Sequence, residues 1–277
     1  MKSSSSISCA AFALIFFFTV NFSAQAQTSA DTGSTWHIIG NDLSTSWQDA
    51  GGVFYAPLHF TGTQWLATGG VVVGTVALMS LDQTGRDIAQ RNQSSTGTTF
   101  ANIGREYGQA EIGGAIGAAI YIGGLAFKCD NTRVTGRMVL ESLLFSGVTT
   151  LVLKSAIGRS RPYTNNGPHN FLGFQFGTDN TSLPSGHTTV AFAVSSTLAA
   201  RIHNTWATIG LYSLATLTAG ARIYEDAHWL SDTFLGAAIG TSVGMAVTHL
   251  GESGNGSTSQ SLYITPGLGG VNITYVF

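Results

Sequence analysis

Histidines and cations are scarce in this chain, and several of them stand at the ends of apolar segments. The 277 residues include 12 Lys or Arg and 7 His. One short cluster contains Arg222, His228 and Asp232. If this stretch is helical, His228 and Asp232 share a face, so the carboxylate would hold the imidazole and leave its other nitrogen free as a nucleophile or base. A lone pair of this kind is more often an ordinary helix contact, so other clusters must support it.

A second cluster supplies two cations. Lys154 falls in the last turns of an apolar segment and Arg161 lies just beyond it, where Pro162 helps to stop the helix. Either cation alone would usually stabilise a helix C-terminus or extend from an apolar surface to water. Together they can also bind an anion.

The remaining cluster is the sequence Pro184-Ser185-Gly186-His187, which opens the next apolar segment. Pro and Gly favour a turn, and the helix that follows starts with unpaired backbone N–H groups. Such a terminus is an anion site, because the free donors and the helix dipole both favour negative charge. The Ser185 hydroxyl would add a donor or simply cap the helix.

The order of these clusters and the spacing within each resemble the three-part motif of the type 2 phosphatidic acid phosphatase superfamily. That superfamily also includes bacterial acid phosphatases and vanadium haloperoxidases. The matching stretches are 154–162, 184–187 and 222–232. In one departure, Ala221 stands where the family usually has Ser, which removes a hydroxyl contact but none of the principal charges.

The resemblance implies a role for each polar residue of the motif. The phosphate-binding residues that it implies are Lys154, Arg161, Ser185, Gly186 and Arg222. The catalytic residues that it implies are His228, His187 and Asp232. His228 would attack phosphorus to give a phosphohistidine, Asp232 would hold its far nitrogen, and His187 would protonate the leaving oxygen and then activate water. No metal ion or other cofactor is expected, because three cations already offset the phosphate charge.

The expected function is therefore that of a metal-independent phosphatase acting on a phosphate monoester or pyrophosphate, in particular of a lipid. A vanadium-dependent haloperoxidase and a non-catalytic phosphate-binding protein are the alternatives. The expected partner is a phosphorylated lipid or a small phosphomonoester, with membrane association also open. Nucleic acid is not expected, because the net charge is -2 and no basic run is present.

Six apolar segments must position these clusters, near 64–81, 109–127, 137–157, 187–202, 205–221 and 229–249. They predict an all-α fold, a bundle of about six core helices in which the connectors after the third and fifth segments meet at one end. Alternating residues at 261–265 and 271–277 predict a short C-terminal β-hairpin. The expected divisions are a signal peptide (1–26), a polar N-terminal extension (27–63), the phosphatase helical domain (64–250) and a C-terminal tail (251–277).

The N-terminus predicts export. Lys2 precedes an apolar run at 9–20, and an Ala-Gln-Ala sequence at 24–26 offers a cleavage site. An uncleaved N-terminal anchor is the alternative. Cleavage would leave Cys129 as the single cysteine, so no internal disulfide is expected.

Composition leaves the relation to the membrane open. Only 9% of residues are charged and 44% are hydrophobic, which indicates helices buried in a large core or in lipid. If all six segments spanned a bilayer after signal cleavage, the connectors with the motif would face the cytoplasm. Because exported phosphatases of this family work outside the cytoplasm, a periplasmic helical domain, soluble or resting on the membrane, is preferred.

Several other residues carry weaker expectations. His169 lies between the first two motif clusters and could border the pocket. Phe171, Phe174 and Phe176 would line an apolar entrance for a lipid or, as the preferred interpretation, belong to the core. Glu141 is expected to pair with Arg137, and Glu225 and Asp226 are not expected to touch an anionic substrate.

Overall fold

The computed structural model describes residues 34–253, 261–267 and 270–276. The predicted signal peptide lies outside these residues. The α-helices of the described residues are α2 (Thr35–Tyr55), α3 (Gly62–Met79), α4 (Asp82–Arg91), α5 (Ser95–Tyr107), α6 (Ala110–Ala126), α7 (Asp130–Ile157), α8 (Gly186–Ile202), α9 (Thr205–Tyr224) and α10 (Leu230–Ser253). Beyond them, β1 (Ser261–Gly267) and β2 (Gly270–Val276) pair antiparallel, with Ser261 opposite Val276.

The helical fold is confirmed, but the expected count of about six helices is too low, since the described residues form nine α-helices. The six apolar segments became α3 and α6 to α10. The three additional helices, α2, α4 and α5, come from polar stretches outside the six apolar segments. Ser34 caps α2 and Ser94 caps α5 through side-chain oxygens, while α4 has Asp82 in its first turn and Arg91 in its last, which suits the helix dipole.

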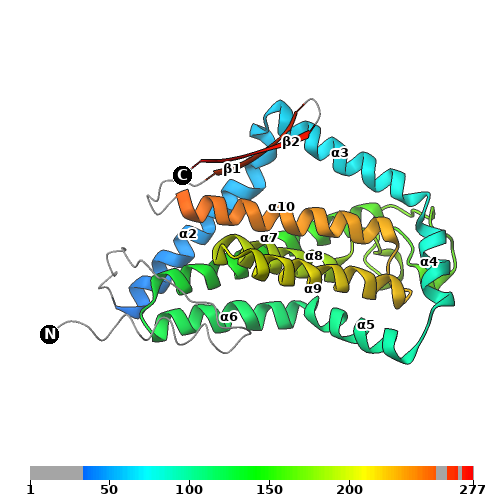
Figure 1. The fold of residues 1–277 in the computed structure, drawn as a ribbon, viewed down its shortest axis with the longest axis horizontal. Helices are drawn as coiled ribbons and strands as arrows, with labels where there is room; N and C mark the ends of the chain where they lie inside the picture. The colour runs from blue at the N-terminus through cyan, green and yellow to red at the C-terminus, as the bar shows by residue number, and fades with distance from the viewer. Residues whose placement is uncertain (1–33, 254–260, 268–269, 277) are drawn as a thin grey trace.

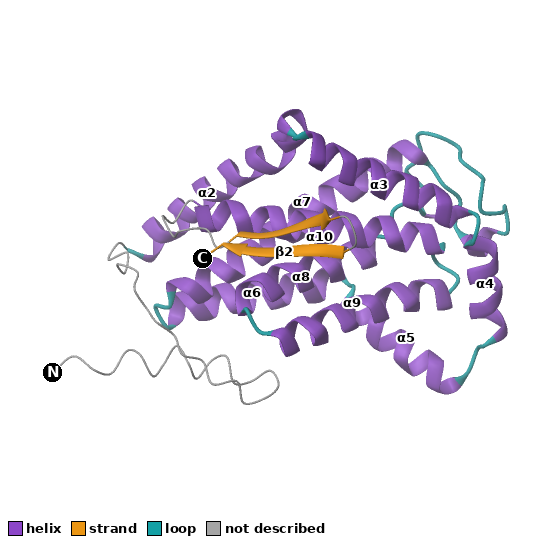
Figure 2. Ribbon diagram, turned by 45° about the horizontal axis from the view of Figure 1, so that its top comes forward, coloured by secondary structure: helices purple, strands orange, loops and turns teal. Residues whose placement is uncertain are grey.

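Helices α7, α8, α9 and α10 lie side by side along the long axis of the molecule, with α6 against α7 and α5 against α9 (Figure 1). The buried apolar core between α7 and α10 includes Met138, Phe145, Val243 and Val247. Short α4 crosses one end of this bundle, where the loop between α7 and α8 also lies (Figure 2). This end is where the motif clusters meet.

A close approach between α8 and α10 brings two of the clusters together. A Cβ atom at Gly240 of α10 would lie 2.4 Å from the carbonyl oxygen of Thr189 in α8, and one at Gly236 would lie 2.6 Å from that of Ser185. The two backbones can be this close only because these positions carry no side chain. The start of α8 is therefore packed directly on the first turns of α10.

At the other end of α7, ion pairs hold α2 against the bundle. Arg137 donates to Asp49 at 3.0 Å and to Glu141 at 2.8 Å, which confirms the expected Arg137–Glu141 pair. Arg133 of α7 also pairs with Asp42 of α2. These groups are largely buried, and their pairing offsets the cost of removing charges from water.

Three helices in the described residues are long and apolar enough to cross a membrane: α3, α7 and residues Leu230–Glu252 of α10. Helix α3 lies on the outside of the bundle along α10 (Figure 1). Its side chains Leu66, Val72, Val73 and Val76 are exposed. An apolar surface of this kind marks a membrane-associated protein.

Candidate active site

The first cluster is positioned by a sharp end to α7. Gly158 has φ +64°, and a Cβ atom there would lie 1.7 Å from the carbonyl oxygen of Gly173. The backbone N–H of Leu172 donates to the Gly158 carbonyl at 2.9 Å. Only glycine fits this left-handed turn under the folded-back loop. As a result Lys154 stays within the helix and Arg161 lies beyond the turn.

The His228–Asp232 pair does not share a helix face, because α10 begins at Leu230, after the histidine. The expectation of a helical pair is therefore wrong in its geometry, although the two side chains do meet. Asp232 Oδ2 accepts a hydrogen bond from the backbone N–H of Trp229 at 2.9 Å and lies 3.4 Å from His228 Nδ1. The Asp232 carboxylate thus binds the backbone N–H of the residue before α10 and lies beside the side chain of His228.

The surroundings of His228 define its tautomer. Its side chain is 2% exposed, and Ser182 Oγ also lies 3.4 Å from Nδ1. The Ser182 hydroxyl donates its proton to Asp232 Oδ2, so both neighbours of Nδ1 present lone pairs. Nδ1 therefore carries the proton, and Nε2 keeps its lone pair.

Burial, followed by the positive charges nearby, lowers the pKa of His228 well below its usual value. The neighbouring groups that act in the same direction are Lys154, Arg161, Arg222 and His187. The neighbours of His228 thus include the cations and the second histidine of the three clusters, in addition to Asp232. A neutral imidazole at neutral pH follows from this environment.

The second cluster starts α8 at Gly186. Ser185 is buried, and its Oγ accepts a hydrogen bond from Thr188 Oγ1 at 2.9 Å rather than capping the helix. Its own hydroxyl proton remains available for an acceptor. The backbone N–H groups at the first turn of α8 add the donors expected of a helix start.

Two of the three cations are oriented by backbone carbonyls. Lys154 Nζ donates to the carbonyl oxygens of Thr181 and Ser182, the latter at 3.3 Å. Arg161 Nε donates to the carbonyl of Thr178 at 2.7 Å. These contacts use neutral backbone acceptors, and no carboxylate in the described part of the chain pairs directly with Lys154 or Arg161.

Arg222 differs, because Glu225 pairs with its guanidinium. Its Nε atom is buried and has no hydrogen-bond partner among the described residues. Arg105 of α5 also approaches Glu225, at 3.7 Å. Sequence reasoning missed Arg105, because it lies in a polar connector far from the motif. Glu225 therefore contacts two arginines, Arg222 and Arg105.

His187 is half-buried near the start of α8. Burial lowers its pKa to about 4, assisted by the charges of Arg222, Arg161, Lys154 and Arg105. A phosphate dianion bound among these cations would add negative charge beside the ring and raise that pKa again.

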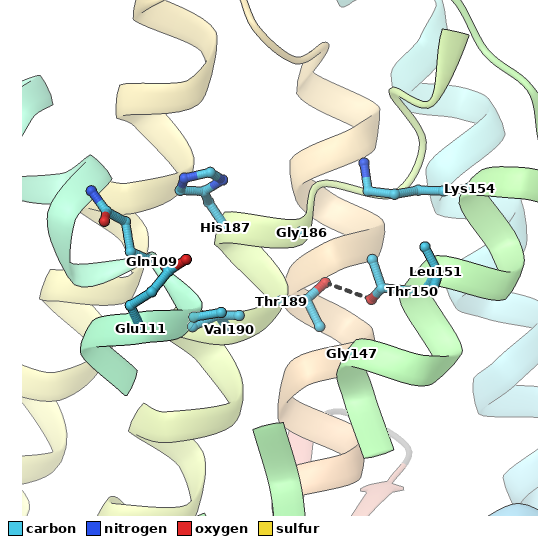
Figure 3. A pocket seen from close by; sticks show the side chains of 12 residues that line it. Gln109, Glu111, Gly147, Thr150, Leu151, Lys154, Gly186, His187, Thr189 and Val190 are labelled. Atoms are coloured by element: carbon cyan, nitrogen blue, oxygen red, sulfur yellow. Dashed lines mark hydrogen bonds between the residues drawn. The ribbon is translucent and has the colours of Figure 1, made fainter. Parts of the chain in front are cut away.

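A cavity of about 360 Å³ opens beside Lys154, Gly186 and His187. Figure 3 shows Lys154 and His187 on opposite sides of it, with the Thr150–Thr189 hydrogen bond of 3.2 Å below them. Helices α6, α7 and α8 form its walls, and His228, Arg161 and Arg222 are not among its lining residues. The cavity therefore adjoins Lys154 and His187 and lies between α6, α7 and α8.

Four other expectations fell on the loop between α7 and α8. His169 is exposed and does not line the cavity. Phe174 is 81% exposed and Phe176 87%, so the preference for a core position is wrong for both. Phe171 is 42% exposed and covers the guanidinium of Arg159 at 5.4 Å.

Sequence reasoning assigned no role to two fully buried charges behind the histidine. Arg159 lies within the first cluster, and Asp82 begins α4. Both are essentially inaccessible to solvent, and Arg159 pairs with Asp82 and with Asp232.

The fold and this geometry define a helical protein in which a histidine, oriented by a carboxylate, faces a cluster of cations at one end of the bundle. Residues 136–253, which carry all three clusters, match the family model of the PAP2 superfamily. This part of the chain is therefore similar to that superfamily.

The matches to individual proteins cover a short stretch of the chain or have low sequence identity. The chain is 40% identical to the lipid A 1-phosphatase of Porphyromonas gingivalis over 70 residues, which are 24% of this chain and only 16% of that protein. Two solved structures are similar. Aquifex aeolicus LpxE has 20% identity and a TM-score of 0.46, covering 61% of this chain and 94% of that one. The transmembrane PAP2 type phosphatidylglycerolphosphate phosphatase of Bacillus subtilis has 18% identity and a TM-score of 0.48, covering 66% and 95%.

Proposed function

We propose that the chain is a phosphatase that hydrolyses a phosphate monoester or pyrophosphate of a lipid, through a phosphohistidine and without a metal ion. The observation that carries this proposal is the placement of the motif side chains around His228. Lys154 Nζ reaches the Ser182 carbonyl at 3.3 Å, Arg161 Nη1 reaches the carbonyl of Ala227, the residue before His228, at 3.4 Å, and Asp232 lies behind Nδ1. The match of residues 136–253 to the PAP2 superfamily model supports the reaction class. A lipid A 1-phosphatase among the relatives supports a lipid substrate.

The chemistry has two steps. In the first, Nε2 of His228 forms a bond to phosphorus while the bond from phosphorus to the leaving oxygen breaks, and His187 gives that oxygen a proton. In the second, His187 takes a proton from water, whose oxygen bonds to phosphorus as the N–P bond breaks. The products are the dephosphorylated alcohol, or a shorter phosphate, and inorganic phosphate.

The cations make this attack possible. Lys154, Arg161 and Arg222 would bind the non-bridging oxygens, together with Ser185 and the backbone N–H of Gly186. They offset the negative charge that repels a nucleophile and stabilise the charge of the transition state. Asp232 stabilises the positive charge that His228 gains on bonding to phosphorus, as a carboxylate does behind a reacting imidazole.

The cavity between α6, α7 and α8 would hold the lipid part of the substrate. It begins at Lys154 and His187 and continues along Gly147, Leu151 and Val190. Leu151 is exposed on α7, a helix apolar enough to lie in a membrane. A lipid could therefore present its phosphate to the cations without leaving the bilayer entirely.

We further propose that the protein is exported and that its site faces the periplasm, as the apolar run and cleavage sequence near the N-terminus suggest. The direction of α3 restricts which membrane topologies are compatible with a periplasmic site. Helix α3 runs toward the site, since α4 follows it directly and contacts the residues behind His228. A spanning α3 would place residue 62 and the site on opposite sides of the membrane, so a periplasmic site requires a retained N-terminal segment or an α3 that rests on the surface.

Phosphate release from the purified full chain in EDTA tests the proposed reaction. The panel would contain phosphatidic acid, phosphatidylglycerol phosphate, undecaprenyl pyrophosphate, lipid A and p-nitrophenyl phosphate, each with wild-type protein and with His228→Ala. The proposal expects release that His228→Ala abolishes, and an alkaline quench in denaturing detergent that traps phosphate on the wild-type chain alone, because the N–P bond of a phosphohistidine survives in base and breaks in acid. Bromide oxidation after adding vanadate would instead indicate a haloperoxidase, and phosphate binding without turnover a binding protein.

A further inference from the structure

Arg159 lies fully buried between two carboxylates behind the proposed nucleophile. Its Nη1 donates to Asp232 Oδ1 at 2.6 Å and its Nη2 donates to Asp82 Oδ2 at 2.6 Å. All three side chains have 0% exposure. An ion network with no access to water is costly to form unless every charge is paired and every donor is used, so its retention calls for a reason.

The hydrogen-bonding capacity of Arg159 is fully used. Besides the two carboxylates, Nη1 donates to Ser231 Oγ at 2.7 Å, and Nε and Nη2 both donate to the Pro168 carbonyl. These bonds account for the five N–H donors of a guanidinium. The aromatic rings of Trp229 and Phe171 lie 5.5 Å and 5.4 Å from its central carbon. The group can hardly rotate, so it fixes the direction of the Asp232 carboxylate.

Asp82 is equally constrained. Its Oδ1 accepts from the backbone N–H of Ser231 at 2.9 Å, and its Oδ2 accepts from Ser231 Oγ at 2.7 Å as well as from Arg159. Asp82 begins α4, which lies before the 136–253 stretch that matches the family model. A helix outside that stretch thus supplies a charge to the centre of the site.

We propose that Asp82 and Arg159 are positioning residues for the phosphatase reaction: Arg159 fixes Asp232 against His228, and Asp82 neutralises Arg159 so that Asp232 keeps its negative charge for the imidazole. This inference rests on the proposed function. Asp232 uses one oxygen for Arg159 and the other for His228, Ser182 and the Trp229 N–H.

The charge balance gives the direction of the effect. Asp82, Arg159 and Asp232 together carry a net charge of about -1 if all are ionised. Without the charge of Asp82 the sum is zero, and the cation on Asp232 is no longer compensated. The positive form of His228 is then less stabilised, so its pKa falls and its Nε2 becomes a weaker nucleophile. The charged or titratable groups that face His228 from every element around it are Lys154 (α7), Arg161 (the α7–α8 loop), His187 (α8), Arg222 (α9) and Asp232 (α10).

The decisive variant is Asp82→Asn, which keeps the shape and most acceptors of the side chain but removes its charge. We expect kcat on p-nitrophenyl phosphate to fall on the order of 10- to 100-fold, the loss expected for one charge-assisted hydrogen bond, with KM changed little. The acid limb of the pH–rate profile should move to lower pH. The His228 Nδ1 proton resonance, identified by its absence in His228→Ala, should move upfield as its bond to Asp232 weakens.

Arg86→Gln is the matched control. Arg86 lies one turn further along α4 and binds Asp226 through two bonds of 2.7 Å, so it also fastens α4 to the chain before His228 without touching Asp232. We expect this variant to lower Tm but to leave the acid limb and the Nδ1 proton resonance in place. If Asp82→Asn and Arg86→Gln change the same quantities alike, Asp82 acts only by docking α4 and the inference is wrong.

A double variant separates charge from folding. Combining Asp82→Asn with Arg159→Gln removes both buried charges and restores a net of about -1 on Asp232 alone. The acid limb and the Nδ1 resonance should return toward their wild-type positions even if Tm falls further, whereas simple additivity of the two changes would contradict the inference. The resonance can be measured without turnover, so an inactive wild-type protein would refute the proposed function while still testing this charge relationship.

Discussion

The backbone N–H of Ser185 donates a hydrogen bond to the backbone carbonyl of Asp232 at 2.9 Å. This single bond joins the turn before α8 to the first turn of α10. It therefore fixes the proposed anion-binding start of α8 relative to the Asp232 carboxylate behind His228. The close packing of α8 on α10 continues along several turns of both helices. Changes to the helix contact should therefore be felt in catalysis as well as in stability.

Gly240→Ala tests this coupling. The added Cβ would meet the Thr189 carbonyl at 2.4 Å, so the helices must separate, at a cost of about 1–3 kcal/mol in the free energy of unfolding. We also expect kcat to fall, because Asp232 and Ser185 move with the two helices. Gly210→Ala in α9 is the control, since its Cβ would meet nothing within 4 Å. Chemical denaturation in detergent and phosphate release measure the two effects. Equal stability of both variants would contradict the packing argument.

Replacing the proposed nucleophile and its carboxylate should have graded effects. His228→Ala is expected to lower kcat on the order of 10⁴-fold or more, because no other group takes over the attack. Asp232→Asn should lower it by at least about 100-fold, since an amide can present the wrong group to Nδ1. Only the aspartate variant should still accumulate a phosphohistidine, more slowly, in a rapid-quench experiment. A phosphorylated His228→Ala protein would place the covalent step elsewhere.

The depressed pKa values of the two site histidines predict a loss of stability in acid. An unfolded histidine titrates near pH 6.5, whereas the pKa of folded His187 is lowered to about 4. Between these values the unfolded chain binds a proton that the folded chain does not, so stability falls as pH drops from about 6.5 toward 4. His228, with a pKa also well below 6.5, acts in the same direction.

Tm measured from pH 7.5 to pH 4 checks this linkage. The His187→Gln variant should show a shallower fall, because one of the two groups no longer titrates. A wild-type Tm that stays level, or rises, on acidification would contradict the environment described for these rings.

The cavity between α6, α7 and α8 predicts how lipid preference can be changed. Gly147 lines this cavity, and a side chain there would meet no neighbour within 4 Å of its Cβ. Gly147→Phe should fill the space and lower the ratio of kcat/KM on a long-chain lipid phosphate to that on p-nitrophenyl phosphate by about 10-fold. Gly114→Phe on α6 has equally open surroundings without lining the cavity and serves as control. An unchanged ratio in Gly147→Phe would mean that the lipid binds elsewhere.

The apolar segments and the motif clusters could be predicted from the sequence, because each depends on local properties. Runs such as 187–202 must be buried, and a turn such as Pro184-Ser185-Gly186 fixes a helix start. The predicted pairing of His228 with Asp232 on one helix face was wrong, because it too relied only on local spacing. Spacing shows that two residues can meet, but the bond from Trp229 N–H to Asp232 shows that here they meet at a helix start.

Contacts between residues far apart in the chain could not be predicted from the sequence. Asp82 and Arg159 are 77 positions apart, and neither is distinguished from an ordinary surface charge until the fold buries them. Arg105 likewise lies outside the three motif clusters, and no spacing in the sequence places it beside Glu225. For Phe174 and Phe176 the sequence indicated burial in general, but not whether protein or lipid would provide it.

The position of Asp82 bears on where the smallest working unit of this chain begins. A fragment cut to the family segment, residues 136–253, would keep every residue of the three clusters and yet leave the Arg159 guanidinium and the Ser231 amide facing a gap where their partner had been. Such a fragment is expected to fold poorly or to lose its activity. Trimming this protein for expression, or grafting its site onto another scaffold, must therefore keep the short polar helix that starts at Asp82.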